Sequence, residues 1–231
     1  VGVIMDDSFA DGDRSGGADA AGGVWWTTSA GSAIDIEPGK LGLVAGNSGR
    51  GIRSTFEPQT LDTGQTLNAS FTFATPVTVG FDRQDAFRVG FHDRLERAEL
   101  EADLVASSGT PNEIYNGLPG YMVTFDVNRE DPALNNIDIR RHIPIKTIGR
   151  LMGTYRGYDL LAEGGPSFMF EPNRTYSGVV SLTKTNAGLE ISSELSNEDG
   201  VITNFSHLDP DSIVNNFGMM AFHVNSKTFG Y

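Results

Sequence analysis

The sequence predicts an all-β fold: an antiparallel β-sandwich of the jelly-roll kind with one short helical insertion. Short segments of alternating apolar and polar residues recur along the chain, turn residues separate them, and only one stretch has helical spacing. Alternation with period two is typical of strands with one buried face, and many such strands indicate a sandwich or barrel. With 231 residues, 28 glycines and no linker or internal repeat, we expect a single β-sandwich domain over residues 1–231.

Two segments show the alternation most clearly. In residues 66–73, the apolar side chains at 67, 69, 71 and 73 fall on one face, and in residues 87–92 phenylalanine and valine alternate with Arg88, Gly90 and His92. Adjacent Trp25 and Trp26 point to opposite faces if extended, so at most one belongs to the core. We expect further strands at 1–5, 24–28, 33–37, 40–44, 51–56, 121–127, 137–141, 176–183, 189–193, 201–205 and 217–224, with a hairpin across 37–40.

Two segments depart from this pattern. Residues 93–105 place Leu95, Ala98, Ala102 and Val105 at spacings of three and four, which predicts a helix inserted between strands. Residues 143–172 are rich in Gly, Tyr and Pro and are expected to form a long irregular loop, and loops of this length are usually functional or mobile.

The composition limits the possible partners and compartments. The formal net charge is −13, from 30 acidic and 17 basic residues, which argues against nucleic acid because that binding depends on neutralising phosphates. The chain has no cysteine, so disulfides and thiolate metal sites are excluded. No apolar run is long enough to span a membrane. We expect an exported bacterial protein, extracellular or on the cell surface, whose signal peptide has been removed, and a module of a larger protein.

Several segments resemble the concanavalin A-like lectin/glucanase superfamily in its bacterial LamG-like jelly-roll form. The matching segments are Asp6–Asp13, Trp25–Trp26, Gly39–Leu41, Phe87–Asp93, Gly120–Val123 and Phe217–Phe222. They occur in the correct order over most of the chain, although each is short. The resemblance implies two curved antiparallel sheets, often a calcium ion near the termini, and sugar binding or sugar cleavage on the concave face. It does not distinguish binding from cleavage.

An acidic segment near the start is the candidate metal site. Oxygen-bearing side chains are dense between residues 6 and 13, with a glycine for the turn, and calcium prefers oxygen ligands. Asp6, Asp11 and Asp13 are the predicted ligands of a structural calcium ion, and Asp126 or Asp209 could join them from distant strands. The alternative is a solvated turn in which the aspartates cap their own backbone.

Charged and polar residues recur on one side of several predicted strands. The pairs are Arg88 with His92, Arg140 with His142, and His223 with Asn225. If these sides line one concave sheet, they form a groove able to hydrogen-bond sugar hydroxyls or to pair with uronate carboxylates. The alternative is an ordinary polar outer face.

Aromatic residues supply a second kind of sugar contact. Tyr155 and Tyr158 lie in the long loop, where their rings could stack on the apolar face of a sugar. With the polar pairs they complete the predicted ligand-binding set.

Three functions stay open at this point. The first is a non-catalytic carbohydrate-binding domain that binds a polysaccharide or oligosaccharide. The second is a polysaccharide lyase acting on a uronate-containing glycan, for which His92, His142, Tyr121 and Arg88 would supply the base and neutralise the carboxylate. The third is a cell-surface adhesion module. A glycoside hydrolase is rejected because no strand carries the carboxylate pattern Glu-x-Asp-x-x-Glu of the family's glucanases.

Overall fold

The computed structural model describes most of the chain. The described residues are 2–15, 21–28, 33–44, 50–76, 78–79, 86–104, 113–126, 135–143, 151–153, 155, 157–224 and 229–230. Their strands are β1 (Trp25–Thr27), β2 (Ala33–Glu37), β3 (Lys40–Val44), β4 (Arg50–Thr60), β5 (Thr66–Ala74), β6 (Thr78–Val79), β7 (Ala86–His92), β8 (Gly120–Asp126), β9 (Ile137–His142), β10 (Tyr158–Gly164), β11 (Thr175–Thr185), β12 (Gly188–Asn197), β13 (Gly200–Asp209), β14 (Asn216–Val224) and β15 (Phe229–Gly230).

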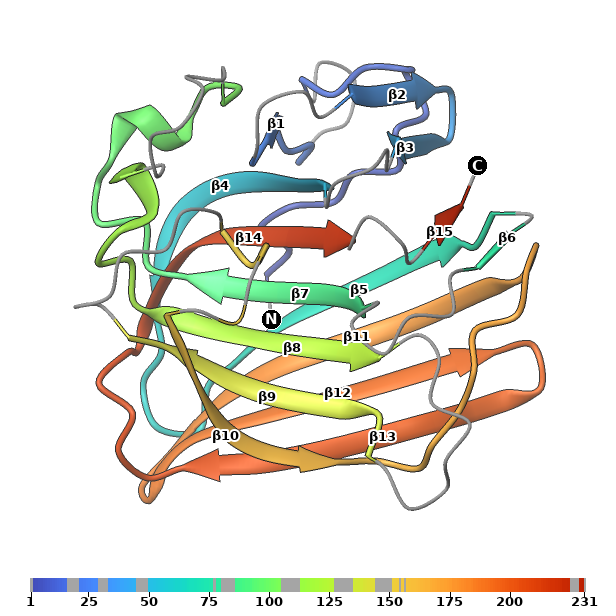
Figure 1. Ribbon diagram of the computed structural model, residues 1–231. Helices are drawn as coiled ribbons and strands as arrows, with labels where there is room; N and C mark the ends of the chain where they lie inside the picture. The colour runs from blue at the N-terminus through green and yellow to red at the C-terminus, as the bar shows by residue number, and fades with distance from the viewer. Residues whose placement is uncertain are drawn as a thin grey trace.

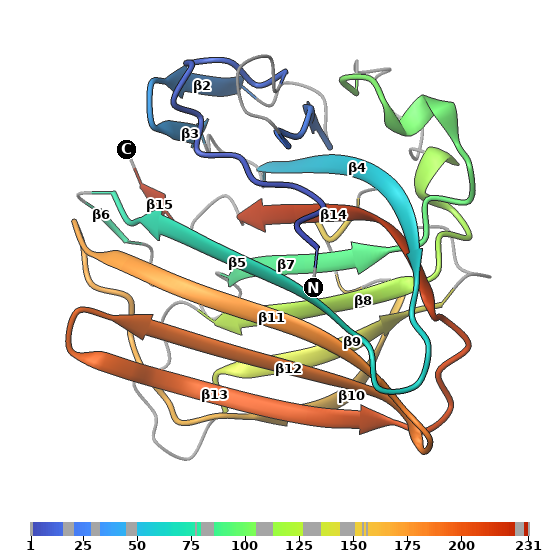
Figure 2. The same cartoon turned by 180° about the vertical axis from the view of Figure 1, so that it is seen from behind.

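Two antiparallel sheets form the sandwich (Figure 1). The front sheet has seven strands in the order β1-β4-β14-β7-β8-β9-β10, and the back sheet has four in the order β13-β12-β11-β5. Figure 2 shows the back sheet from behind, with the front sheet beyond it. The pairs β2–β3 and β15–β6 form two small ribbons, the first with Glu37 opposite Lys40 as the hairpin prediction requires. The β-sandwich prediction is therefore confirmed.

The predicted apolar faces meet between the sheets. Phe87, Val89 and Phe91 of β7 lie in the core, and so do Leu67 and Ala69 of β5. Trp25 is buried in this core while Trp26 is only partly buried, as expected for adjacent residues of a strand. Burying one face of each sheet is what holds a sandwich together, because a single sheet has no other place for its apolar side chains.

The opposite face of the front sheet is also covered. We call it the front face: it carries the side chains that point away from the back sheet. A second buried cluster lies there, in which four residues of the sheet (Met122, Tyr158, Met219, Ala221) pack against loop residues. The loop residues are Leu100, Tyr115, Leu118, Leu151 and Met152.

Three sequence predictions were wrong. The helix at 93–105 is reduced to a 3₁₀ turn at Ala98–Leu100, and Leu95 and Glu96 before it have positive φ angles of 49° and 54° that no α-helix contains. The loop at 143–172 contains a regular strand, β10. Residues 2–5, expected in a strand, are in none. No helix in the described ranges is long and apolar enough to cross a membrane.

Candidate functional site

The front face brings together most of the predicted ligand-binding residues. Cross-strand register places His223 of β14 opposite Arg88 of β7, Arg88 opposite Thr124 of β8, and Thr124 opposite Asp138 of β9. These four residues form one row across the sheet. His92, Arg140, His142 and Tyr158 lie on the same face in the next rows. Asn225, which belongs to the same prediction, lies outside the described residues.

Most of these side chains are covered. His92 is 0% exposed, and Arg88, His142 and His223 are only 2–3% exposed. The loop residues of the second buried cluster fill the middle of the front face, so the expected open groove is not present there. The sequence could predict which side chains share a face but not that loops would pack on it. That these residues contact a ligand stays a prediction.

A neutral His–Tyr cluster lies at one end of the front face. His92 Nε2 is 3.1 Å from the Tyr158 hydroxyl, and His142 Nδ1 donates to the carbonyl of Leu118. Burial, with a contribution from nearby His142, lowers the pKa of His92 to about 3. Burial also lowers the pKa of His142 and raises that of Tyr158. At neutral pH this cluster therefore carries no charge.

Two glycines make the space that His92 occupies. A Cβ built on Gly120 would lie 2.5 Å from Cδ2 of the His92 ring, and one on Gly90 would lie 2.9 Å from its Cε1. A side chain at either position would displace the ring, so the local sequence is adapted to holding a buried histidine here.

A charged cluster lies toward the opposite end of strands β7, β8 and β9 from the His–Tyr cluster. We call Arg88, Thr124, Asp138, Arg140 and Tyr155 the Arg140 cluster. The guanidinium carbons of Arg88 and Arg140 lie 4.6 Å and 4.0 Å from the centre of the Tyr155 ring. Arg140 Nη2 also donates to Asp138 Oδ2 at 2.9 Å, and Arg88 Nη1 donates to the Met152 carbonyl at 2.6 Å.

The Arg140 cluster keeps unused hydrogen-bonding capacity. In the part of the chain that the structure describes, four of its buried polar atoms have no partner: Arg88 Nε, Thr124 Oγ1, Asp138 Oδ1 and Arg140 Nε. Buried polar atoms normally find partners. The cluster also reaches solvent, because the Arg140 side chain is 13% exposed and Tyr155 is half-buried. Donors, acceptors and an aromatic ring therefore meet at one margin of the sheet.

Sequence reasoning missed the residue that anchors the loops on this face, Arg53 of β4. It is 0% exposed and donates to the carbonyls of Leu100, Ala102 and Thr27 at 2.6–2.8 Å. It also donates to the hydroxyl of Tyr115 at 2.6 Å. The sequence places Arg53 in the predicted strand 51–56, but this does not identify what its side chain contacts.

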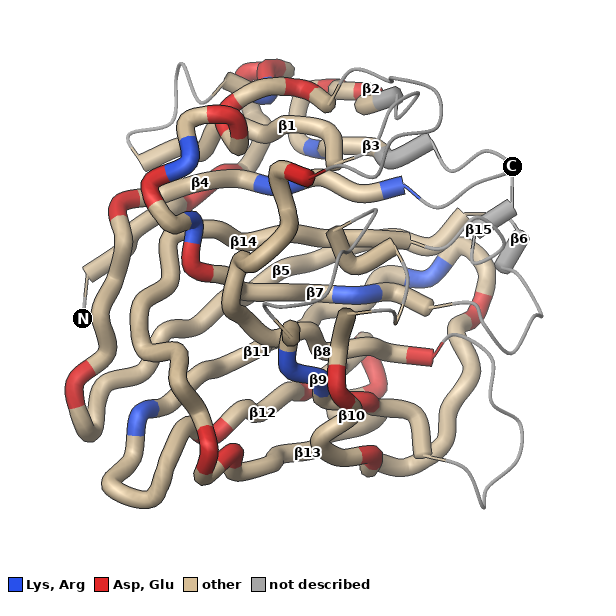
Figure 3. The backbone as a smooth tube through the Cα atoms, turned by 60° about the vertical axis from the view of Figure 1, so that its left-hand side comes forward, with Lys and Arg blue, Asp and Glu red and all other residues tan. Residues whose placement is uncertain are grey.

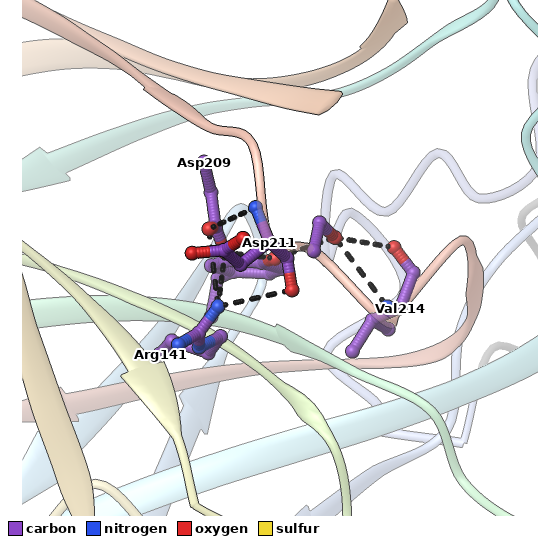
Figure 4. Close-up of polar contacts among 6 residues, drawn as sticks. Arg141, Asp209, Asp211 and Val214 are labelled. Atoms are coloured by element: carbon purple, nitrogen blue, oxygen red, sulfur yellow. Dashed lines mark hydrogen bonds and ion pairs between the residues drawn. The ribbon is translucent and has the colours of Figure 1, made fainter. Parts of the chain in front are cut away.

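Tyr121, expected beside the histidines in the lyase prediction, points the other way. Its hydroxyl lies between the sheets, 2.8 Å from Asp209 Oδ2 and 2.7 Å from Ser212 Oγ. Arg141 and Asp209 bond in the same network (Figure 4). Alternation along β8 puts the Tyr121 side chain on the opposite face of the front sheet from His92, so the structure does not bring these two residues together.

The acidic segment forms turns. Asp11 Oδ1 accepts from the backbone N–H of Asp13, and Asp13 Oδ1 accepts from that of Ser15. Hydrogen bonds from Ser15 lower the pKa of Asp13. Within the described ranges no three His, Asp or Glu side chains are placed to share a metal ion. The structure thus does not group Asp6, Asp11 and Asp13 around one point, and the calcium site stays a prediction from the sequence.

Comparison with known proteins gives similarities of fold. No family model matches the chain, and no curated protein sequence matches it. Among solved structures, lectin I-B4 from Griffonia simplicifolia in its metal-free form is similar with a TM-score of 0.49 and 12% identity, over 92% of this chain and 94% of that chain. Basic winged bean lectin with Tn-antigen is similar with a TM-score of 0.47 and 13% identity, over 87% of this chain and 81% of that chain. A legume lectin-like domain from Entamoeba histolytica is similar with a TM-score of 0.42 and 9% identity, over 89% of this chain and 82% of that chain.

These values concern architecture only, and they say nothing about which residues of this chain bind a ligand. The two antiparallel sheets that the resemblance to concanavalin A-like lectins implied are present in the described structure. Its bacterial LamG-like form stays a prediction.

Proposed function

We propose that this chain is a non-catalytic carbohydrate-binding domain and that the Arg140 cluster contacts the sugar. The observation that carries the proposal is the set of buried donors and acceptors without partners beside the half-buried Tyr155 ring. Sugars offer both hydroxyls and apolar ring faces. A hydroxyl can donate to Asp138 Oδ1 and accept from an Arg N–H, and a C–H face can lie on an aromatic ring.

The charges of the cluster suit a polyhydroxyl ligand, with or without a carboxylate. Arg140 is paired with Asp138, which largely balances its charge, while Arg88 donates to the Met152 carbonyl and leaves the cluster one net positive charge. A hydrogen bond to a charged group contributes about 1.5–3 kcal/mol, which suits recognition of hydroxyls by a small site. Non-catalytic binding is supported by the burial of His92 and His142, which keeps both rings out of reach of a polymer, and by the position of Tyr121 on the other face.

Binding is tested on an array of neutral and acidic plant, algal and bacterial glycans, followed by calorimetry on each glycan that binds. We expect Arg140→Ala to weaken binding roughly 10- to 100-fold, as the loss of a charged hydrogen bond would. Tyr155→Ala should weaken it too, while Tyr155→Phe keeps the ring. Arg174→Ala, a distant surface control, should have no effect. Equal affinity of wild type and Arg140→Ala would contradict the proposal.

The lyase is a second candidate because His92 and Tyr158 are in contact and Arg88 lies on the same face. Absorbance of an unsaturated product released from uronate glycans, abolished by His92→Ala, would support it in place of simple binding. Its difficulty is that a fully buried His92 cannot reach a polymer unless the covering loops open.

Three further proposals concern context. We infer that the protein is exported from a bacterium, extracellular or at the cell surface, and a module of a larger protein. Fractionation of the producing cells tests the location.

Calcium at Asp6, Asp11 and Asp13 stays a prediction from the sequence, and a rise in Tm with calcium that chelator reverses would support it. An adhesion module without sugar specificity would bind no glycan on the array.

A further inference from the structure

Half of the chain's six methionines lie beside two of its four histidines on the front face. Met122, Met152 and Met219 are each 0% exposed and belong to the second buried cluster, which covers His92 and His142. Met219 lies opposite His92 across β14 and β7, and Met122 lies one row away on β8. Soft thioether groups and imidazole rings therefore share one buried space.

The thioether of Met152 reaches His92 through the gap at Gly90. A Cβ built on Gly90 would lie 2.4 Å from Met152 Sδ and 2.9 Å from His92 Cε1. The sulfur and the imidazole ring thus meet over a position that has no side chain. Because Nδ1 of His92 is bonded to this Cε1 atom, the thioether and the nitrogen are close.

The backbone is strained at the residue that supplies this sulfur. Met152 has a φ angle of 54°, in the left-handed region that side chains of its size rarely adopt. A residue in this region costs about 1–3 kcal/mol, and such strain collects at functional sites. The strained conformation is fixed by a contact with the sheet, since the Met152 carbonyl accepts a hydrogen bond from Arg88 Nη1 at 2.6 Å.

Each histidine of the His–Tyr cluster has one ring nitrogen engaged and one without a partner. His142 Nδ1 donates to the Leu118 carbonyl, which can only accept, so in the neutral ring the lone pair is on Nε2. Within the described ranges, His142 Nε2 and His92 Nδ1 have no hydrogen-bond partner. His92 Nε2 has the Tyr158 hydroxyl at 3.1 Å and can carry the ring proton there.

This arrangement is the one that metal-binding histidines usually have. Such a histidine donates one ring N–H to a carbonyl or another oxygen, which fixes the tautomer and the ring orientation, and binds the metal through its other nitrogen. For His142 the oxygen is the Leu118 carbonyl, and for His92 it is the Tyr158 hydroxyl. Two nitrogen lone pairs and a thioether are thus available in one buried cluster.

The surroundings favour a singly charged ion. The two rows of the front face that contain His92 and Gly90 have no Asp or Glu, and their charged residues are Arg53 and Arg140. β14 has no charged residue and β7 has only Arg88 (Figure 3). The chain has no cysteine to supply a thiolate. Neutral ligands do not offset the charge of a divalent ion, which makes its burial costly.

We propose that His92 Nδ1, His142 Nε2 and Met152 Sδ bind a soft monovalent metal ion, copper(I), with Met219 as a further thioether beside them. Thioether and imidazole ligands are the ones that copper(I) prefers. The site is separate from the proposed sugar contacts, because none of these residues belongs to the Arg140 cluster. The covering loops must open for the ion to enter, so uptake should be slow.

Competition with the coloured copper(I) chelator bicinchoninate, without oxygen and with ascorbate, tests the site. We expect one copper ion per chain. Met152→Leu and His142→Gln keep similar side-chain sizes and should each weaken binding at least about 10-fold, as the loss of even an outer partner does. Met169→Leu and His207→Gln make the same changes elsewhere, at a 37% exposed methionine and at a histidine of β13, and should bind as wild type does.

Two further measurements make the test independent of how fast the ion enters. Native mass spectrometry of protein refolded with silver(I), a stable soft monovalent ion, should show one ion per chain. X-ray absorption at the copper edge should show a sulfur neighbour that is weakened in Met152→Leu. A wild type that takes up neither ion after refolding would overturn the proposal. So would folded Met152→Leu and His142→Gln, checked by circular dichroism, that bind as tightly as wild type.

Discussion

Arg141 of β9 donates to both carboxylate oxygens of Asp209 at the end of β13, at 3.0 Å each, and this ion pair joins the front sheet to the back sheet. The same carboxylate accepts the hydroxyl of Tyr121 and the backbone N–H of Asp211 (Figure 4). Asp209 is 2% exposed. Three groups from three segments thus form four hydrogen bonds with one buried carboxylate.

Removing that carboxylate should destabilise the sandwich. Asp209→Ala leaves Arg141 and the Tyr121 hydroxyl without their shared partner, and breaking a buried ion pair costs about 3–5 kcal/mol. The free energy of unfolding in urea measures this. Lys40→Ala breaks the exposed pair with Glu37 and should cost about 1 kcal/mol or less. Equal costs for the two variants would mean that the Asp209 network is not structural.

Arg53 should control the loops on the front face. Arg53→Met removes four hydrogen bonds and leaves buried carbonyls unsatisfied, so we expect a loss of roughly 3 kcal/mol or more. Amide hydrogen exchange should speed up first in residues 97–104 and 113–118, which Arg53 holds, and least in β11 and β12. Uniform acceleration over both sheets would show that the loops are not a separate unit.

His92 should make the fold sensitive to acid. Its pKa is about 3 when folded and about 6.5 when unfolded, so below pH 6.5 the unfolded state binds the proton more readily. The free energy of unfolding is therefore unaffected by His92 above pH 6.5. It falls by up to about 1.4 kcal/mol per pH unit as the pH decreases from 6.5 toward 3. The urea midpoint measured between pH 7 and pH 4 should fall less steeply in His92→Gln than in wild type. Parallel curves would contradict this assignment.

Gly164 should tolerate no side chain. A Cβ there would lie 2.0 Å from the Phe205 ring, so Gly164→Ala should destabilise by about 1–3 kcal/mol through overpacking where β10 meets β13. Gly2→Ala is the control, because no atom lies within 4 Å of its Cβ. Thermal melting of both variants checks the difference. A Tm for Gly164→Ala equal to that of wild type would mean that the ring moves freely.

The helix prediction failed because tertiary contacts overrode local spacing. Arg94 pairs with Glu101, Arg97 donates to the Ile114 carbonyl, and Asp103 binds Arg14 through two hydrogen bonds. Spacings of three and four residues describe only the contacts a helix would make within itself. The partners of these charged residues are 7–89 positions away in the sequence, which a local pattern does not contain.

The sequence by itself determined the β-sandwich and the face of each strand, because side chains alternate along a strand whatever it packs against. It therefore placed Arg88, His92 and His223 on one side and Phe87, Val89 and Phe91 on the other. Only the tertiary structure decided that loops fill the middle of the front face, that Arg53 anchors them and that β5 lies at an edge of the back sheet. Burial and pairing depend on which distant segments meet, and alternation carries no information about that.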